Sequence, residues 1–162
     1  MIAVTMEPGL VKGFMGRLLR EDVLDEFEVR GIEIGISTRV SINGALEAAE
    51  TATEEDAPPV KAPTTYVTWE AMRPLVYSII KASSKPRLVK IVFSYKAQAA
   101  TTIHANAAAL FLNMVYENDT VSFTTATAQK DFALDKSLDD SWDEWVRGFF
   151  MRKNIVVTDR EL

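Results

Sequence analysis

The chain of 162 residues contains no cysteine. Disulfides, cysteine-ligated zinc and a cysteine nucleophile are therefore excluded. His104 is the single histidine, which excludes a metal site built on two histidines. No G-x-S-x-G segment accompanies it, as an α/β-hydrolase serine would require. We therefore interpret His104 as a surface residue without a catalytic role.

Sequence motifs for phosphate-binding loops and for calcium-binding loops are also missing. Neither G-x-G-x-x-G nor a GKS or GKT segment occurs, and no EF-hand loop is present. The carboxylates at 139, 140, 143 and 144 could serve as oxygen ligands for magnesium or calcium. Their place at the beginning of a predicted helix already explains them through capping and the helix dipole. The sequence thus predicts no metal and no cofactor, and favours a protein that is not an enzyme.

Long apolar runs are lacking as well. No run approaches the roughly 18 residues that a membrane span needs. The segment MIAVTMEPG has no basic region followed by a long apolar core, as a signal peptide would. The formal net charge of −5 argues against a general affinity for nucleic acid or anionic membranes. We expect a soluble, cytoplasmic protein without a membrane partner.

Hydrophobic residues make up 48% of the chain and charged residues 25%, as in ordinary globular proteins, and the length predicts one domain over 1–162. Residues 47–65, EAAETATEEDAPPVKAPTT, hold almost nothing to bury. We interpret them as a mobile acidic loop within that domain. An acidic segment that binds a partner is the alternative.

The most strongly patterned stretch is 109–134. A tight turn at Asn118-Asp119 would pair two strands, because Asn and Asp tolerate positive φ. This register places Leu112, Met114 and Tyr116 opposite Thr125, Phe123 and Val121. A second turn at Thr127-Ala128 would bring Phe132 beside Phe123 and Leu134 beside Val121. The sequence therefore predicts a three-stranded meander with one apolar face.

An aromatic helix is predicted to follow. Ser137 and Asp140 have the spacing of a capping box. The apolar residues then recur at helical spacing: Leu138, Trp142, Trp145, Val146 and Phe149. We expect this stripe to cover the apolar face of the meander and its tryptophans to lie in the core. Phe150 and Met151 widen the apolar arc, which could mark a dimer contact or an apolar pocket.

Further elements are predicted along the rest of the chain. In order they are a strand at 2–6, a helix at 10–20 with glycines 13 and 16 packed closely on the sheet, one long bent strand or a hairpin at 27–46, a helix capped by Thr68 that Pro74 kinks or delays, a strand at 89–96, a short exposed helix within 97–108 and a strand at 155–157. Together they predict an α+β fold: a mostly antiparallel, twisted sheet with about three amphipathic helices on one face.

Positive charge gathers in residues 67–100, which hold six cationic residues and only one acid, Glu70. Lys90 and Lys96 fall opposite the apolar side of the predicted strand, so an edge strand protected by lysines is the favoured interpretation. The alternative is a binding site for nucleic acid or a phosphorylated ligand, which would use five of the cations: Lys81, Lys85, Arg87, Lys90 and Lys96.

Several segments resemble an uncharacterised bacterial family, a domain of unknown function. They are FMGRLLREDVLDEF, WEAMRPLVYSIIK, IVFSYK, LFLNMVYENDTVSFTTAT and FALDKSLDDSWDEWVRGF. The C-terminal signature has the form LFLN-x-x-YEN followed by LDKSL-x-x-x-WDE. The resemblance covers nearly the whole chain, with 47–65 the most divergent part. It implies a bacterial, single-domain, intracellular protein, and it carries no activity and no catalytic or binding residue.

Three hypotheses for the function stay open. The favoured one is a non-enzymatic binding or self-assembly module, such as a homodimer formed through exposed sheet or the aromatic helix. The second is nucleic-acid or anion binding through the basic segment at 81–96. The third is a small-molecule enzyme whose carboxylates and hydroxyls only the fold brings together.

Overall fold

A computed structural model describes residues 1–47, 64–83 and 85–160. Its elements in chain order are β1 (Ala3–Thr5), α1 (Pro8–Arg20), β2 (Glu28–Gly35), β3 (Arg39–Asn43), α2 (Trp69–Ala82), β4 (Leu88–Ser94), the 3-10 helix η1 (Ala97–Thr102), β5 (Ala107–Glu117), β6 (Thr120–Gln129), α3 (Ser137–Arg152) and β7 (Thr158–Asp159). The predicted acidic loop falls almost wholly outside the described residues and stays a prediction. No helix of the described part has the length and apolar character to cross a membrane.

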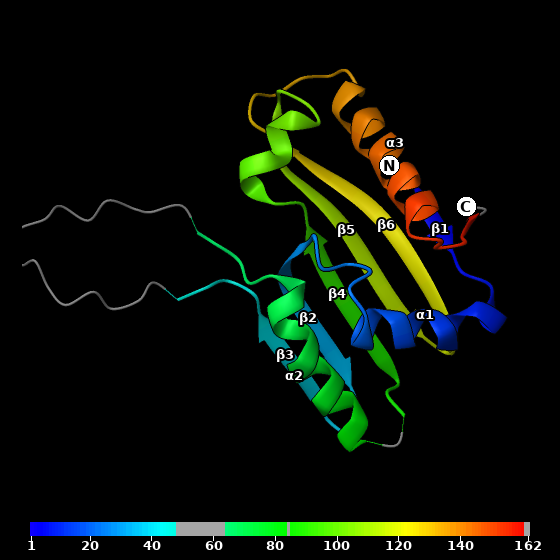
Figure 1. Ribbon diagram of the computed structural model, residues 1–162. Coiled ribbons are helices and arrows are strands. Elements are labelled where there is room, and N and C mark those ends of the chain that lie inside the picture. Colours follow the sequence, from blue (N-terminus) through cyan, green and yellow to red (C-terminus); the bar gives the residue numbers. More distant parts are fainter. Residues whose placement is uncertain (48–63, 84, 161–162) are drawn as a thin grey trace, which may run out of the picture.

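The strands form one seven-stranded sheet in the order β3-β2-β4-β5-β6-β1-β7, and every pairing is antiparallel (Figure 1). Helices α1, α2 and α3 pack on the same face of the sheet, where each strand from β2 to β6 turns its apolar side chains. The predicted α+β class with an antiparallel sheet and helices on one face is therefore confirmed.

The β5–β6 hairpin has the predicted register. Asn118 and Asp119 form its turn with φ values of 52° and 58°, and Met114 pairs with Phe123. A one-residue slip would move the apolar side chains of both strands to the other face of the sheet. The register is therefore fixed by the requirement to bury them.

The predicted third strand of the meander is wrong. β6 does not turn at Thr127-Ala128 but continues to Gln129. Its last residues still pair with the beginning of β5, where Ala107 lies opposite Gln129. The other edge of β6 is taken by β1, whose Val4 pairs with Phe123 in the place expected for Phe132. Phe132 is 86% exposed and Leu134 87% exposed. The meander that the chain does form consists of β4, β5 and β6.

Aromatic side chains dominate the interior between the sheet and α3. Phe27 is fully buried and contacts Phe93, Trp145 and Phe149 edge to face, with ring centroids 5.2 to 6.0 Å apart. Trp142 is also fully buried, and its indole N–H donates to the Phe111 carbonyl at 2.9 Å. The predicted packing of α3 over the apolar face is thus confirmed, although Trp145 is only half-buried.

Other predictions for the helices need correction. Lys136, not Ser137, is the N-cap of α3, and Ser137 donates its backbone N–H to the Asp135 side chain. The glycines of α1 do not pack on the sheet, since a methyl group at Gly13 would meet nothing and one at Gly16 would meet only the Arg20 side chain. They lie on the outer side of the helix.

The helix α2 begins where Thr68 predicts. The Thr68 side chain accepts from the Ala71 N–H, and Pro74 is accommodated inside the helix without displacing its start. Only Trp69 and Val76 are buried there, and Leu75 is half-exposed. The short helix predicted within 97–108 is confirmed as η1.

Three strand predictions are settled by the topology. Residues 27–46 form the hairpin of β2 and β3, with a bulge between Val29 and Gly31. β4 lies between β2 and β5, so the interpretation of it as an edge strand is wrong. The last strand is β7 rather than 155–157, because Ile155 is buried and the pairing with β1 starts at Thr158.

Replacing Phe27 with alanine should lower the free energy of unfolding by about 3–5 kcal/mol, because it leaves a cavity among buried aromatic rings. The matched control, Phe132→Ala, should change it by less than about 0.5 kcal/mol, since that ring touches mostly solvent. Urea unfolding of both variants measures the two values. A loss of similar size for Phe132→Ala would contradict its exposed position. It would indicate that Phe132 is buried, as the predicted third strand requires.

Candidate functional site

The five cations predicted to bind an anion lie at different places in the fold. Lys85 and Arg87 precede β4 at one end of the sheet, and Lys96 follows it at the other, about 20–25 Å away for a strand of seven residues. Lys81 lies in the last turn of α2, with its ammonium 5.9 Å from the centre of the Tyr77 ring. Lys90 lies on the sheet face opposite the helices, between Glu33 and Val115 on the neighbouring strands. Only Lys85 and Arg87 therefore share a site.

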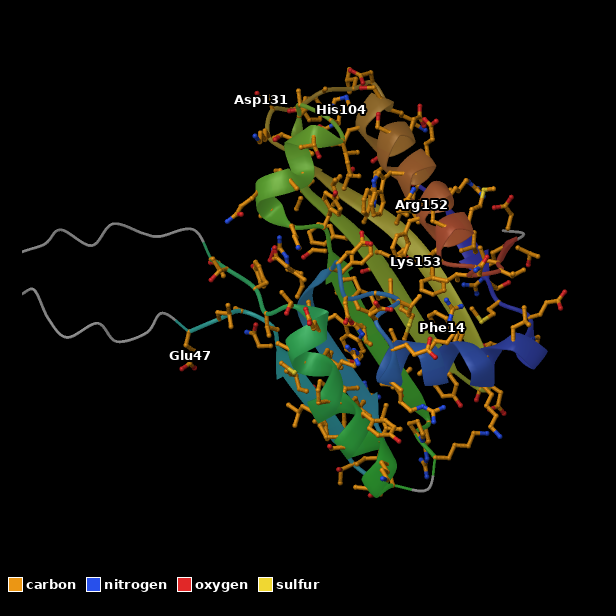
Figure 2. All side chains as sticks on the ribbon, viewed as in Figure 1. Phe14, Glu47, His104, Asp131, Arg152 and Lys153 are labelled. Carbon is orange, nitrogen blue, oxygen red and sulfur yellow. The ribbon has the colours of Figure 1, made fainter. Side chains whose placement is uncertain are left out.

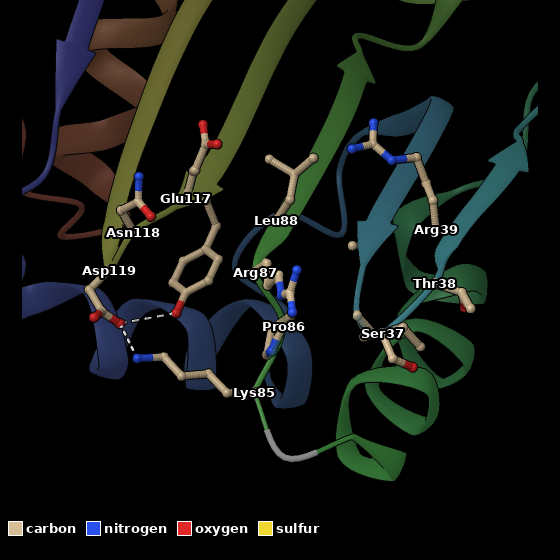
Figure 3. A pocket seen from close by; sticks show the side chains of 13 residues that line it. Ser37, Thr38, Arg39, Lys85, Pro86, Arg87, Leu88, Glu117, Asn118 and Asp119 are labelled. Atoms are coloured by element: carbon tan, nitrogen blue, oxygen red, sulfur yellow. Dashed lines mark hydrogen bonds and ion pairs between the residues drawn. The ribbon is translucent and has the colours of Figure 1, made fainter.

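That site is an open pocket of about 630 Å³ at the end of the sheet (Figure 3). Three loops line it: the β2–β3 turn with Arg39, the segment before β4 with Lys85 and Arg87, and the β5–β6 turn with Asp119. The positive φ values of the β5–β6 turn bring the carboxylate of Asp119 to face Lys85.

The charges in this pocket are largely compensated. The Lys85 ammonium lies 2.6 Å from the Asp119 carboxylate, and the Tyr116 hydroxyl donates to the same carboxylate at 3.2 Å. The hydrogen bond from Lys85 lowers the pKa of Asp119 below its ordinary value, and burial raises the pKa of Tyr116. Arg39 lies 3.3 Å from Glu33. Arg87 is the one pocket cation without a salt bridge to a described residue, so it is the group left to meet an anion.

A second feature is the loop at residues 130–136, which we call the apolar loop. It carries Phe132 and Leu134, the most exposed large apolar side chains among the described residues. Scattered exposed leucines are common on protein surfaces, but two large apolar groups almost entirely in water on one short loop are characteristic of a contact surface.

The backbone of the apolar loop is fixed by two side-chain amides. Asn106 donates to the Asp131 carbonyl at 2.8 Å and accepts from the Asp131 N–H at 2.9 Å. Gln129 does the same for Ala133, at 3.1 and 3.0 Å. Each amide thus pairs with both backbone groups of one residue, as a neighbouring strand would. Phe132 and Leu134 alternate with the two fixed positions and are held in the solvent.

His104 connects η1 and β5 to the end of this loop. Its Nδ1 accepts from the Asn106 N–H at 3.1 Å, so the ring hydrogen is on Nε2, which donates to the Ser137 hydroxyl at 3.0 Å. Ser137 donates in turn to Asp135, and this hydrogen bond lowers the pKa of the Asp135 carboxyl. His104 is half-buried, and its contact with Ser137 lies at the surface. Because its Nε2 already carries a hydrogen, it cannot take a proton from Ser137, and the three residues do not form a hydrolase triad.

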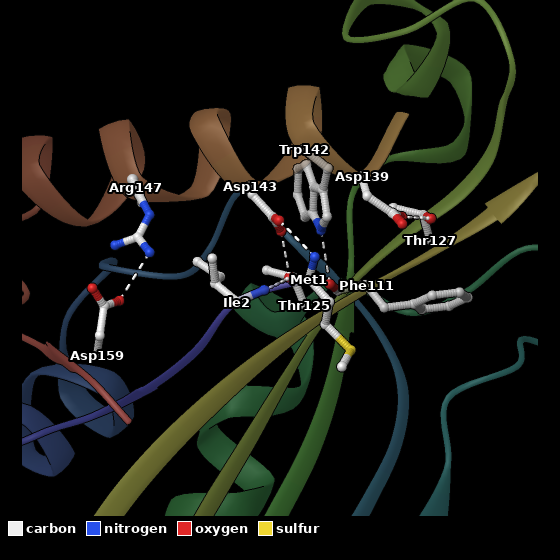
Figure 4. Close-up of polar contacts among 10 residues, drawn as sticks. All are labelled: Met1, Ile2, Phe111, Thr125, Thr127, Asp139, Trp142, Asp143, Arg147 and Asp159. Carbon is white, nitrogen blue, oxygen red and sulfur yellow. Dashed lines mark hydrogen bonds and ion pairs between the residues drawn. The ribbon is translucent and has the colours of Figure 1, made fainter. Parts of the chain in front are cut away.

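The carboxylates of α3 bind hydroxyls of β6 (Figure 4). Thr125 donates to Asp143 at 2.5 Å, and Thr127 donates to Asp139. The amine of Met1 lies 2.8 Å from Asp143. These contacts attach the first turns of α3 to the sheet. Among residues 1–47, 64–83 and 85–160, no three histidine, cysteine or acidic side chains gather as a metal ion would need.

Removing both amides, Asn106→Ala with Gln129→Ala, should release the loop while leaving the sheet intact. Hydrogen exchange at the Asp131 and Ala133 amides should become about 3- to 10-fold faster, the amount expected for one lost hydrogen bond each. Asn113→Ala, on the open face of the sheet, is the matched control and should leave both rates unchanged. Equal rates in the double variant and the wild type would show that the amides do not hold the loop.

Comparison with known proteins identifies the family. A family of unknown function, DUF5721, matches residues 17–158, from the last turn of α1 to the first residue of β7. The match covers most of the chain, so the chain belongs to this family. No curated protein and no solved structure matches it.

Proposed function

We propose that this DUF5721 member is a non-enzymatic docking protein that binds a macromolecular partner through the apolar loop. The observation that carries the proposal is the exposure of Phe132 and Leu134, 86% and 87%, on a backbone held by Asn106 and Gln129. The proposal takes the protein to be a single domain of the bacterial cytoplasm, as the sequence suggests.

The energetics of association favour such a loop. Burying the two side chains against a partner would contribute about 1.5–3 kcal/mol each. A flexible loop would lose part of this gain, because its residues would have to be ordered on binding. Here the side-chain amides of Asn106 and Gln129 have already ordered the backbone in the free protein. The loop can therefore bind with little entropic loss.

The chemistry near the loop supports binding rather than catalysis. Ser137 and His104 are engaged in a chain of hydrogen bonds that ends on Asp135, which leaves the serine without a base. Asp139 and Asp143 are occupied by threonine hydroxyls. These polar side chains hold the apolar loop and the first turns of α3 in place.

Site-specific photo-crosslinking tests the proposal. With p-benzoylphenylalanine in place of Phe132, irradiation of cells of the native host should give one or a few discrete protein adducts, because the side chain lies within the contact. Adding Leu134→Ser should reduce these adducts at least about 10-fold. The matched control places the same residue at Leu75, an exposed leucine of α2. Adducts that are absent, or equal at positions 132 and 75, would contradict docking by this loop.

A second candidate function is binding of a small phosphorylated anion in the pocket of Arg39, Lys85 and Arg87. The observation in its favour is the Arg87 guanidinium, which has no salt bridge to a described residue in a pocket of about 630 Å³. Bidentate pairing with phosphate is the typical use of such a group. The partly compensated charges of Lys85 and Arg39 make this the weaker proposal.

Calorimetric titration with inorganic pyrophosphate at low salt tests the second candidate. Binding should weaken at least about 10-fold in Arg87→Ala, since the loss of one charge-assisted pair costs about 1.5–3 kcal/mol. Lys90→Ala is the matched control, because Lys90 lies on the open sheet face outside the pocket. Binding that is absent at about 10 mM ligand, or equally weakened by Lys90→Ala, would remove this candidate.

A further inference from the structure

A second apolar surface lies at the opposite end of α3 from the apolar loop. Leu10, Met151 and Val156 are exposed there by 42%, 79% and 61%. They border two adjoining cavities of about 200 and 440 Å³, which share Asn154, Ile155 and Val156 in their walls. The buried rings of Phe14 and Phe150 contribute to these walls. We call this surface the apolar groove.

We propose that the apolar groove of one molecule receives the apolar loop of a second copy of the chain. The inference rests on the proposed function, since it requires the loop to be a docking element, and it names the partner. Two apolar side chains from neighbouring positions, Phe132 and Leu134, would enter two adjoining cavities. The exposed apolar groups of both surfaces would then be removed from water together.

The separation of the two surfaces requires two molecules. The apolar loop precedes the first residue of α3, and the groove begins at its last turn and the segment that follows. A helix of 16 residues is about 24 Å long. Figure 2 shows Asp131 at the end of the molecule where α3 begins, and Arg152 and Lys153 toward the other end of this helix. A loop held by Asn106 and Gln129 cannot reach the groove of its own chain.

The charges around the two surfaces are complementary. Residues 130–140 contain four aspartates and two lysines, so the loop and the first turn of α3 are net acidic. The groove is lined by Arg17 and Arg147, and no described acidic residue lines either cavity. Arg147 pairs with Asp159 at 2.8 Å, and Arg17 lies 3.9 Å from Glu21, so each of these side chains has a carboxylate nearby. The segments that border the groove are still net basic, because residues 8–20 contain three cations and no acid, and residues 147–160 contain four cations and one acid. Attraction between the acidic loop and the basic rim favours this partner over an unrelated apolar one.

The proposed contact joins two different surfaces, the apolar loop of one molecule and the apolar groove of the other. A two-fold pair would use the contact twice, and an open chain of molecules would use it once between neighbours. In both cases each molecule contributes one loop and one groove. A variant with only a damaged loop can still offer its groove, and a variant with only a damaged groove can still offer its loop.

Sedimentation velocity with full-length protein tests this inference. The loop variant combines Phe132→Ser and Leu134→Ser, and the groove variant is Val156→Asp; all three positions are exposed, so both variants should fold. We expect the wild type to associate and each variant alone to do so at least about 100-fold more weakly. An equal mixture of the two variants should regain a one-to-one complex. The matched control, Leu75→Ser, should associate like the wild type.

The outcomes separate this inference from the function on which it rests. A wild type that stays monomeric up to about 1 mM overturns the inference, and so does a mixture of variants that forms no complex. If crosslinked adducts at position 132 still form in cells, docking stands and the partner is another macromolecule. If no adducts form either, both proposals fail. A crosslinked adduct of twice the chain mass in the purified protein, absent when Val156→Asp is added, supports the self-association.

Discussion

The packing of α3 on the β5–β6 hairpin is the interaction on which the rest of the structure depends. Trp142 inserts beneath the helix and bonds the Phe111 carbonyl, while Thr125 donates to Asp143 from the neighbouring strand. These contacts fix where the chain leaves the sheet and where it resumes as a helix. The intervening loop crosses outside the core, and Phe132 and Leu134 lie in solvent there. The exposed apolar surface is thus a consequence of the fold.

Local patterns predicted the parts of the fold that local forces determine. The β5–β6 register follows from alternation around Asn118-Asp119, and the start of α2 follows from the Thr68 cap. The prediction of a third strand was wrong because Phe132 and Leu134 occupy alternate positions, as the apolar residues of a strand do. The true neighbour of β6 is β1, which is more than 100 residues away in the chain. Pairing over such a separation leaves no local signal in a single sequence.

The candidate sites were harder to predict. The cation cluster marked Lys85 and Arg87 correctly as neighbours, but the pocket also needs Arg39 and Asp119 from two other turns. The apolar loop depends on Asn106 and Gln129, which are ordinary residues in weakly patterned sequence. Their role arises only when the beginning of β5 and the end of β6 lie side by side. The one available signal was an apolar pair, Phe132 and Leu134, set between charged residues.

The account has at its centre a loop that is rigid and apolar before any partner binds. Backbone ¹⁵N relaxation of residues 131–135 in a monomeric sample measures this rigidity most directly. The account predicts order parameters of about 0.85, similar to those of the sheet. Values below about 0.6 would show a loop that moves freely on the picosecond to nanosecond timescale. That result would contradict a preformed docking surface, and Phe132 and Leu134 would then be exposed without a defined arrangement.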